Sequence, residues 1–376
     1  MKNLSPSGSS VTLVVLSVFC SGSMAHAWSG PEQPVPYTEE DVSFENPQAN
    51  VRLAGTLTLP RGQSPFPAVV LVAGSGPVNR DEELFGHRPF AVLADHLTRR
   101  GVAVLRYDKR GVAGSTGDFS QATTMDFAED AAAGWDYLAA RPDIDREQIG
   151  AVGHSEGGMI IPTLAVERPG VAFLVMLAGV GMSGGELEAL QNSLLGQAKG
   201  VGEPELAYEQ ETIRQWVAMV AAGAKGHEIE RVLRPRVEVS SKGHLEEVKQ
   251  WVARFHAPWW QFILTHSAMP DLEKVRCPVM ALNGSKDLQV PPKENLGPIA
   301  CALAAGGNTD FVIRELPGLN HLFQHAETGS EAEYDLITET IAPEVLQMVG
   351  DWISQHLSSQ PTPRTVRQQV GGDPSR

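Results

Sequence analysis

Short apolar runs alternate with longer amphipathic stretches over the first half of this chain, and this alternation restricts its fold more than any other feature. The apolar runs have the length of buried strands, and the stretches between them have the helical period of about 3.6 residues. Strands are expected at residues 67–73, 102–107, 149–152 and 171–178, and helices at residues 90–100, 125–140 and 158–167. Such an order requires a largely parallel sheet with helices on both faces and ligands at the carboxyl ends of the strands.

Further elements are expected on both sides of this region. Residues 42–45 and 51–59 have the alternating pattern of an antiparallel hairpin. Two more buried strands are expected at residues 277–282 and 311–316, and a last helix at residues 343–357. The fold class is therefore α/β, with a mostly parallel sheet of about eight strands.

The pentapeptide Gly-His-Ser-Glu-Gly at residues 153–157 lies where an expected strand gives way to a helix. A serine hydroxyl is a weak nucleophile unless a base lies beside it. The two glycines permit the sharp strand-to-helix turn that exposes such a hydroxyl, because neither carries a Cβ that would clash. We therefore predict that Ser155 is a catalytic nucleophile.

Two similar glycine patterns lie further along the chain. Residues 181–185 also read G-x-S-x-G, and residues 179–184 match the dinucleotide fingerprint G-x-G-x-x-G. A dinucleotide site needs a second parallel strand with an acidic residue near its end, whereas the chain after Gly185 shows helical periodicity. We therefore reject the dinucleotide site and interpret Ser183 as the exit from a strand into a helical insertion, with a substrate contact as the alternative.

A base and an acid for Ser155 are expected in the second half of the chain. Asp287 follows the strand expected at residues 277–282, and His321 follows the strand expected at residues 311–316. The chain order serine, aspartate, histidine, with each residue in a loop after a strand, is that of one large class of serine hydrolases. We predict that Ser155, Asp287 and His321 form a catalytic triad.

These two partners also have other interpretations. Alone, Asp287 reads as a turn former and His321 as a loop residue, and His321 with His325 has a spacing that could bind zinc if a third ligand converged. No further zinc motif supports that site, so we expect neither a metal nor a cofactor. His154, beside the nucleophile, is interpreted as a packing residue.

A serine hydrolase also needs N–H donors for the oxyanion of its tetrahedral intermediate. One donor is expected from the backbone of Glu156, the residue after the nucleophile. The other is expected from Ser75, within the Gly-Ser-Gly-Pro loop at residues 74–77 that follows the first parallel strand. The alternative is that residues 74–77 are only a loop.

Four motifs together resemble those of a known group. They are Ala-Gly-Ser-Gly-Pro at residues 73–77, Asn-Arg-Asp-Glu at 79–82, Tyr-Asp-Lys-Arg-Gly at 107–111 and the pentapeptide extended to Gly158. Over residues 42–356 the chain resembles bacterial carboxylesterases of the α/β-hydrolase superfamily, related to the dienelactone-hydrolase-like and prolyl-oligopeptidase-like branches. The resemblance implies an α/β-hydrolase fold with an inserted helical cap and a Ser-Asp-His acyl hydrolase. Many esterases have His-Gly where this chain has Ala73-Gly74, so any hydrogen bond made by that histidine is absent.

The helical insertion, at residues 184–270, divides the expected core into residues 28–183 and 271–357. Its aromatic residues, including Trp259, pack within the cap or form an apolar substrate pocket. Arg80, in a charged loop beside Ser75, is either solvated, or orders that loop, or binds a polar substrate end. We predict Arg80 and Trp259 as candidate substrate-binding residues.

The two ends of the chain are expected to lie outside the fold. Residues 1–27, with an apolar run at 11–20 and Ala-His-Ala before the cleavage point, fit a secretory signal. A buried or anchoring helix is the alternative, but the apolar run is only about half the length needed to span a bilayer. The protein is therefore expected to be exported, to the periplasm or beyond. Residues 358–376 are poor in large apolar residues and are expected to be disordered.

The composition fits an ordinary globular enzyme of 376 residues, and the formal net charge of −15 argues against a nucleic-acid partner. The expected substrate is a small ester, and the expected activity is that of a serine carboxylesterase. A serine exopeptidase or amidase with the same triad is the closest alternative, and a non-catalytic binding protein is a more distant one. The oligomeric state, and whether Cys277 and Cys301 form a disulfide, stay open.

Overall fold

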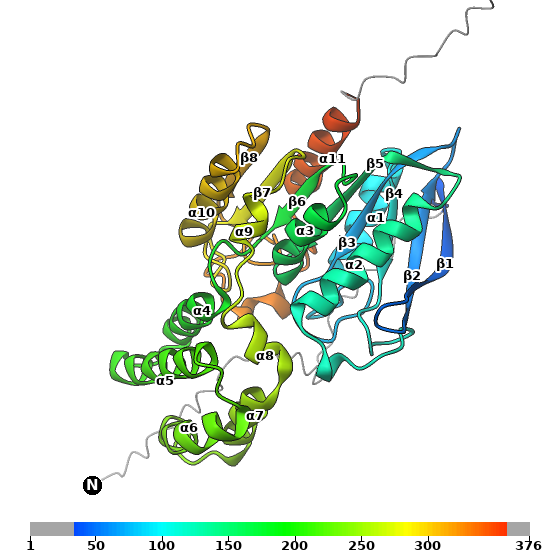
Figure 1. Ribbon diagram of the computed structural model, residues 1–376. Coiled ribbons are helices and arrows are strands. Elements are labelled where there is room, and N and C mark those ends of the chain that lie inside the picture. Colours follow the sequence, from blue (N-terminus) through cyan, green and yellow to red (C-terminus); the bar gives the residue numbers. More distant parts are fainter. Residues whose placement is uncertain (1–33, 359–376) are drawn as a thin grey trace, which may run out of the picture.

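The computed structural model describes residues 34–358, and Figure 1 shows how their helices and strands are arranged. The signal peptide expected at residues 1–27 and residues 359–376 of the expected tail lie outside this range. One sheet of eight strands runs through the described part. Its strands are β1 (Tyr37–Asn46), β2 (Val51–Pro60), β3 (Phe66–Val72), β4 (Ala103–Tyr107), β5 (Ile144–His154), β6 (Leu174–Leu177), β7 (Val279–Gly284) and β8 (Phe311–Leu316).

The strand order is β1-β2-β4-β3-β5-β6-β7-β8. β2 pairs antiparallel with both β1 and β4, whereas all pairs from β4 to β8 are parallel. The chain belongs to the α/β type with a mostly parallel sheet, and the fold predicted from the alternation is confirmed. β5 begins at Ile144, earlier than expected, because residues 145–148 are polar and partly or fully exposed, and so lack the apolar pattern of a buried strand.

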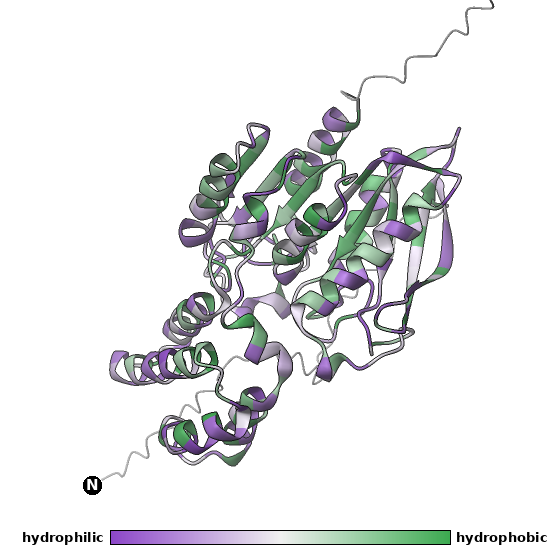
Figure 2. Ribbon diagram, in the orientation of Figure 1, coloured by the Kyte–Doolittle hydropathy of each residue, from purple (hydrophilic) through white to green (hydrophobic). Residues whose placement is uncertain are grey.

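Helices cover both faces of the sheet, and each face has its own apolar core. One core joins alternate strand residues to α2 (Thr124–Ala139), α3 (Glu156–Glu167) and α10 (Pro292–Ala305). The other joins the remaining strand residues to α1 (Pro89–Arg99) and α11 (Pro343–Ser358). Figure 2 shows the apolar residues concentrated in the strands, with polar residues on the outer sides of the helices. The sheet is therefore buried on both faces, as parallel strands require.

Between β6 and β7 the chain forms a set of helices beside the sheet domain, which we name the insertion (residues 184–270; Figure 1). It comprises α4 (Gly184–Ala198), α5 (Glu203–Ala221), α6 (Gly226–Ser240), α7 (Leu245–His256) and α8 (Pro258–Ile263), and α9 (Met269–Leu272) follows. Trp216, Trp251 and Phe255 lie in a separate apolar core within it. α8 is separate from α7 because Pro258 disfavours helical backbone at the preceding residue, Ala257.

Two short 3₁₀ helices complete the described elements, η1 (Phe119–Gln121) and η2 (Glu331–Leu336). Within residues 34–358, none of the helices is long and apolar enough to cross a bilayer. Cys277 and Cys301 are both free thiols, and burial raises the pKa of Cys277 to about 12. A thiol with such a pKa is a poor nucleophile at neutral pH, since the thiolate is the reactive form.

Candidate active site

Ser155 lies on a strained turn between β5 and α3. Its backbone has φ 54° and ψ −116°, values that residues with a Cβ rarely adopt. A Cβ at Gly153 would lie 2.2 Å from the carbonyl oxygen of Gly157, and one at Gly157 would lie 1.9 Å from that of Val72. The turn therefore requires glycine at both positions, and it leaves the Ser155 side chain at the carboxyl end of the sheet.

His321 and Asp287 are in direct contact. Nδ1 of His321 lies 2.8 Å from Oδ2 of Asp287, and the two side chains are 5% and 0% exposed. The other carboxylate oxygen accepts hydrogen bonds from the backbone N–H groups of Gln289 and Val290, each at 2.8 Å. These bonds fix the carboxylate, which in turn holds the proton of His321 on Nδ1 and leaves Nε2 as the basic nitrogen.

The loops that carry Asp287 and His321 pack tightly against each other. A Cβ at Gly284 would lie 2.1 Å from the carbonyl oxygen of Leu319, and the N–H of Lys286 donates to the same oxygen at 2.9 Å. The parallel pairing of β7 with β8 places both loops at one edge of the sheet. The meeting of Asp287 and His321 thus follows from the strand order.

Ser155, Ser75 and Glu156 line one narrow cavity at the boundary with the insertion. The volume open to the centres of water molecules is about 50 Å³. The remaining lining residues are Met159, Val180, Gly184, Leu187, Glu188, Gln191, Trp259, Trp260, Ile263, Gln289 and Val290. The wall is mainly apolar, with polar groups near the nucleophile and on α4.

The structure brings His321 to the end of β5, next to the turn of Ser155, without a hydrogen bond between the two side chains among the described residues. The rings of His321 and His154 have their centroids 4.8 Å apart, and His154 is the residue before Ser155. Without a substrate, catalytic hydrogen bonds are often long and become shorter only when the substrate binds. The ring contact brings His321 next to the residue before Ser155, and its role as the base for the hydroxyl stays a prediction.

The two N–H groups expected to bind an oxyanion are both unused. Among the described residues, no hydrogen bond engages the backbone N–H of Ser75 or of Glu156. The loop before Ser75 lies against the nucleophile, because a Cβ at Gly74 would lie 3.1 Å from the Cβ of Ser155. Two free donors and a serine hydroxyl thus share one cavity.

A buried pair, Glu82 and His154, was not foreseen from the sequence. The carboxylate oxygen Oε1 of Glu82 lies 3.0 Å from Nδ1 of His154 and accepts the N–H of Gly74 at 2.6 Å. Nε2 of His154 lies 3.0 Å from the backbone oxygen of His321. Burial by itself lowers the pKa of His154, but the charge and hydrogen bond of Glu82 outweigh it and raise this pKa. Protonated His154 donates from both nitrogens, and so joins the loop of Gly74 to the loop of His321.

The expectation that His154 only packs is therefore incomplete. No local pattern could have revealed the pair, since Glu82 lies within a run of charged residues that reads as a solvated loop. In the structure Glu82 is 1% exposed. The sequence offers one indication of the pair. His154 lies beside the nucleophile, and a buried imidazole needs hydrogen-bond partners.

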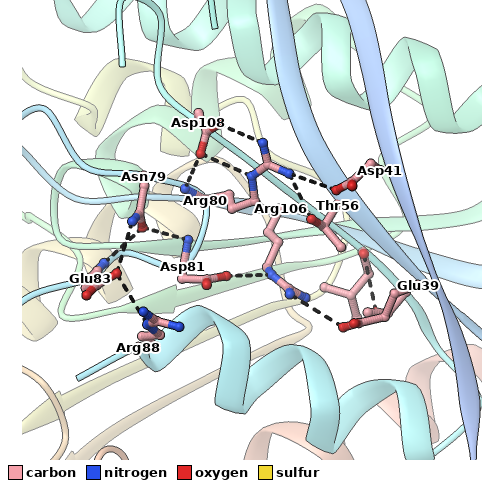
Figure 3. Close-up of polar contacts among 12 residues, drawn as sticks. Glu39, Asp41, Thr56, Asn79, Arg80, Asp81, Glu83, Arg88, Arg106 and Asp108 are labelled. Atoms are coloured by element: carbon pink, nitrogen blue, oxygen red, sulfur yellow. Dashed lines mark hydrogen bonds and ion pairs between the residues drawn. The ribbon is translucent and has the colours of Figure 1, made fainter. Parts of the chain in front are cut away.

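Arg80 lies in an ion-pair network that orders the loop between β3 and α1 (Figure 3). Its guanidinium binds both carboxylate oxygens of Asp108, at 3.2 and 2.7 Å, and donates to the hydroxyl of Thr56 at 2.9 Å. The next residue, Asp81, binds Arg106 of β4 at 2.8 Å. Arg80 does not line the cavity of Ser155. These contacts favour the alternative that Arg80 orders the loop, and its role as a substrate contact stays a prediction.

Trp259 lies in the wall of the cavity, and Ser183 lies at the start of α4. Trp259 of α8 lines the cavity, and its indole N–H donates to Oε1 of Glu156 at 2.6 Å. Ser183 is the N-cap of α4 and exchanges hydrogen bonds with Glu186. Its hydroxyl is thus used in starting the insertion, as expected from the sequence.

The histidines considered for zinc have other partners. His321 binds Asp287, whereas His325 is exposed and binds Glu339 and Glu344. Within residues 34–358 there is no group of three or more histidine, cysteine, aspartate or glutamate side chains placed to hold a metal ion.

Comparisons with known proteins identify the family of the chain and several relatives. The model of the family described as X-Pro dipeptidyl-peptidase (S15 family) matches residues 49–296. Esterase EstD of Thermotoga maritima is 36% identical over 148 residues, which are 39% of this chain and 35% of EstD. The chain spans between 35% and 59% of the length of the curated relatives it matches.

Solved structures show the same fold. The α/β hydrolase GrgF from Penicillium sp. sh18 aligns with a TM-score of 0.54 and 18% identity, over 85% of this chain and 99% of GrgF. The Pyrococcus furiosus esterase Pf2001 aligns with a TM-score of 0.51 and 15% identity, over 89% of this chain and 99% of the esterase. At these identities the likeness shows the fold alone, which is that of the α/β hydrolases.

Proposed function

Because the chain belongs to the X-Pro dipeptidyl-peptidase (S15) family, on a match over more than half of its length, we propose that it is a serine hydrolase that cleaves carboxylic esters. The observation that carries this proposal is the cavity in which Ser155 lies beside the unused N–H groups of Ser75 and Glu156. A nucleophilic hydroxyl, two N–H donors for the oxyanion and a base such as His321 are the groups that acyl transfer requires.

In the proposed reaction Ser155 attacks the ester carbonyl while Nε2 of His321 takes the hydroxyl proton. Asp287 stabilises the imidazolium, and the N–H groups of Ser75 and Glu156 bind the oxyanion. His321 then gives the proton to the departing alcohol, which leaves an acyl group on Ser155. Water, deprotonated by His321, releases the acid and restores the serine.

We favour esters over peptides as substrates because EstD, which is 36% identical to this chain over the matched residues, is named an esterase. The cavity also favours compact substrates. Met159, Val180, Ile263 and Val290 form an apolar wall around a small volume, which suits a small or medium hydrophobic acyl or alcohol group. The name of the matched family is the specific observation that keeps a serine peptidase or amidase as the second candidate.

A substrate panel tests this proposal. We expect p-nitrophenyl esters of short and medium acids to be hydrolysed, with Ser155→Ala reducing kcat by roughly 10⁴-fold or more. Aminoacyl and X-Pro p-nitroanilides are expected to be cleaved slowly or not at all. Faster cleavage of the anilides would favour the peptidase, and equal activity of Ser155→Ala on the esters would reject both candidates. Residues 1–27 further support the proposal that the enzyme is exported, which a cleaved amino terminus at residue 28 in a periplasmic or secreted fraction would test.

A further inference from the structure

Lys109, just after β4, places its ammonium group beneath the loop that carries Ser75. Nζ donates to the carbonyl oxygen of Gly74 at 2.6 Å and to Oε2 of Glu156 at 3.1 Å. The side chains of Lys109 and Glu156 are only 5% and 3% exposed, and Nζ lies 4.4 Å from the centroid of the Phe127 ring. The ammonium group of Lys109 is thus buried, and it contacts one backbone carbonyl, that of Gly74, and one carboxylate, that of Glu156.

The carbonyl that Lys109 binds belongs to the same peptide group as the N–H of Ser75. This peptide is trans, since the cis peptide of the described residues is Ser64–Pro65. In a planar trans peptide the C=O and N–H point in opposite directions. With its C=O held by Lys109, the group therefore directs the Ser75 N–H away from the ammonium, and Ser75 lines the cavity. A carbonyl that accepts from a cation is polarised, which makes the N–H of its peptide a stronger donor.

Glu156 connects Lys109 to the second proposed donor and to the insertion. The N–H of Glu156 starts α3 and is unused, while its carboxylate binds Lys109 through Oε2. Oε1 accepts from the hydroxyl of Thr124 at 2.8 Å and from the indole of Trp259 at 2.6 Å. The three donors to the carboxylate thus come from the segment just after β4, from α2 and from α8.

We propose that Lys109 is a positioning residue of the oxyanion hole. It orients and polarises the Gly74–Ser75 peptide, Glu156 is its counter-ion, and Trp259 links this pair to the insertion. The inference rests on the proposed function, because it assigns a role to the N–H of Ser75. Stability alone is a weak explanation for the pair, since buried ion pairs are often replaceable by apolar residues without loss.

Three variants separate positioning from stability. Lys109→Met removes the donor to Gly74 but leaves Glu156 charged and buried, so it can fail to fold. Lys109→Met with Glu156→Gln also removes the donor, yet leaves no uncompensated charge. Arg110→Met with Asp130→Asn is the matched control. It removes a neighbouring buried ion pair of 2.7 Å, with side chains 6% and 1% exposed, that has no contact with the Ser75 loop.

The readouts are kcat and KM on an ester, and the inhibition constants of a trifluoromethyl ketone and of the matching methyl ketone. The trifluoromethyl ketone forms a tetrahedral adduct with an oxyanion, whereas the methyl ketone reports ground-state binding. We expect both Lys109 variants that fold to lower kcat by about tenfold to 100-fold with little change in KM, as weaker oxyanion binding requires. The inhibition constant of the trifluoromethyl ketone rises by the same factor, and that of the methyl ketone stays the same. The control pair keeps all four values within about twofold.

The double variant decides the outcome. If Lys109→Met with Glu156→Gln regains the activity of the unaltered enzyme, or if both ketones weaken equally, the role of Lys109 is structural and the inference is overturned. A different result would show that the proposed function itself is wrong. In that case the unaltered chain shows no hydrolysis that depends on Ser155, and the inference falls with it.

Discussion

His321 presents Nδ1 to Oδ2 of Asp287 at 2.8 Å, and the carboxylate is completely withdrawn from solvent. Two backbone N–H groups from the turn after Asp287 hold its other oxygen. A buried carboxylate that is fixed in this way has one imidazole nitrogen as its partner, and the ring cannot turn without breaking that bond. The orientation of the proposed base is therefore built into the β7 and β8 loops before any substrate binds.

Replacing Asp287 by Asn tests the importance of this orientation. The amide can donate to Nδ1, which places the histidine proton on the wrong nitrogen. We expect kcat on an ester to fall by about 10³- to 10⁴-fold with little change in KM. Asp335→Asn, at an exposed position in η2, is the control and should stay within about twofold of the unaltered enzyme. A tenfold loss or less in the Asp287 variant would contradict the role of the carboxylate.

The elbow predicts a strong contrast between two Gly→Ala variants. Gly157→Ala brings a Cβ to 1.9 Å from the backbone oxygen of Val72, so α3 or β3 must shift. We expect the free energy of unfolding in urea to fall by roughly 1–3 kcal/mol, the usual range for overpacking in a rigid core. Gly297→Ala, in α10, meets nothing within 4 Å and is expected to be neutral or slightly stabilising. Equal stability of the two variants would show that the elbow is not as tight as described.

The Glu82–His154 pair predicts a pH-dependent contribution to stability. The pKa of His154 is raised in the folded state, so the folded protein binds this proton more tightly than the unfolded chain does. The resulting stabilisation is complete below the ordinary histidine pKa of about 6.5 and is lost as the pH rises through the raised value. The difference in free energy of unfolding between the unaltered enzyme and His154→Asn should therefore shrink from pH 6 to pH 9. A difference that grows toward high pH would mean that His154 is neutral in the fold.

Glu209 of α5 predicts a second pH effect, located in the insertion. Burial raises its pKa from 4.5 to about 7. Because the folded state holds the proton more tightly, this stabilisation is present below pH 4.5 and is lost as the pH rises to about 7. Glu209→Gln should therefore raise the melting temperature relative to the unaltered protein at pH 8 and not at pH 4.5. Glu203→Gln, on the exposed first turn of the same helix, is the control. An equal shift of both variants at both pH values would contradict this role of Glu209.

The elements that the sequence predicted are those with a local cause. The strands and helices followed from apolar periodicity, and the turn at Ser155 followed from the need for glycine on both sides of it. The sequence is less informative about the roles of residues whose partners lie far away along the chain. Arg80 was considered for the substrate, because nothing in its own loop indicates that Asp108 and Thr56 receive its guanidinium. The same reason applies to Lys109, whose two acceptors lie 35 and 47 positions away along the chain.

The sequence pattern is least informative for charged residues that the fold buries. Glu82 belongs to a run of polar residues that periodicity assigns to solvent, yet the fold withdraws it beneath the Ser75 loop. A buried carboxylate is tolerated there because His154 and the N–H of Gly74 compensate it. Such compensation joins segments far apart in the chain and has no signature in any single window of sequence.

The central claim is that Ser155 is an activated nucleophile, and covalent labelling tests it most directly. A fluorophosphonate probe, which phosphonylates activated serines, is incubated with the enzyme, and the modified peptide is identified by mass spectrometry. We predict one label per chain on Ser155, complete loss of labelling in Ser155→Ala and at least a 100-fold slower reaction in His321→Gln, about the contribution of a general base. No labelling of the folded enzyme, or a label on another serine such as Ser183, would contradict the claim.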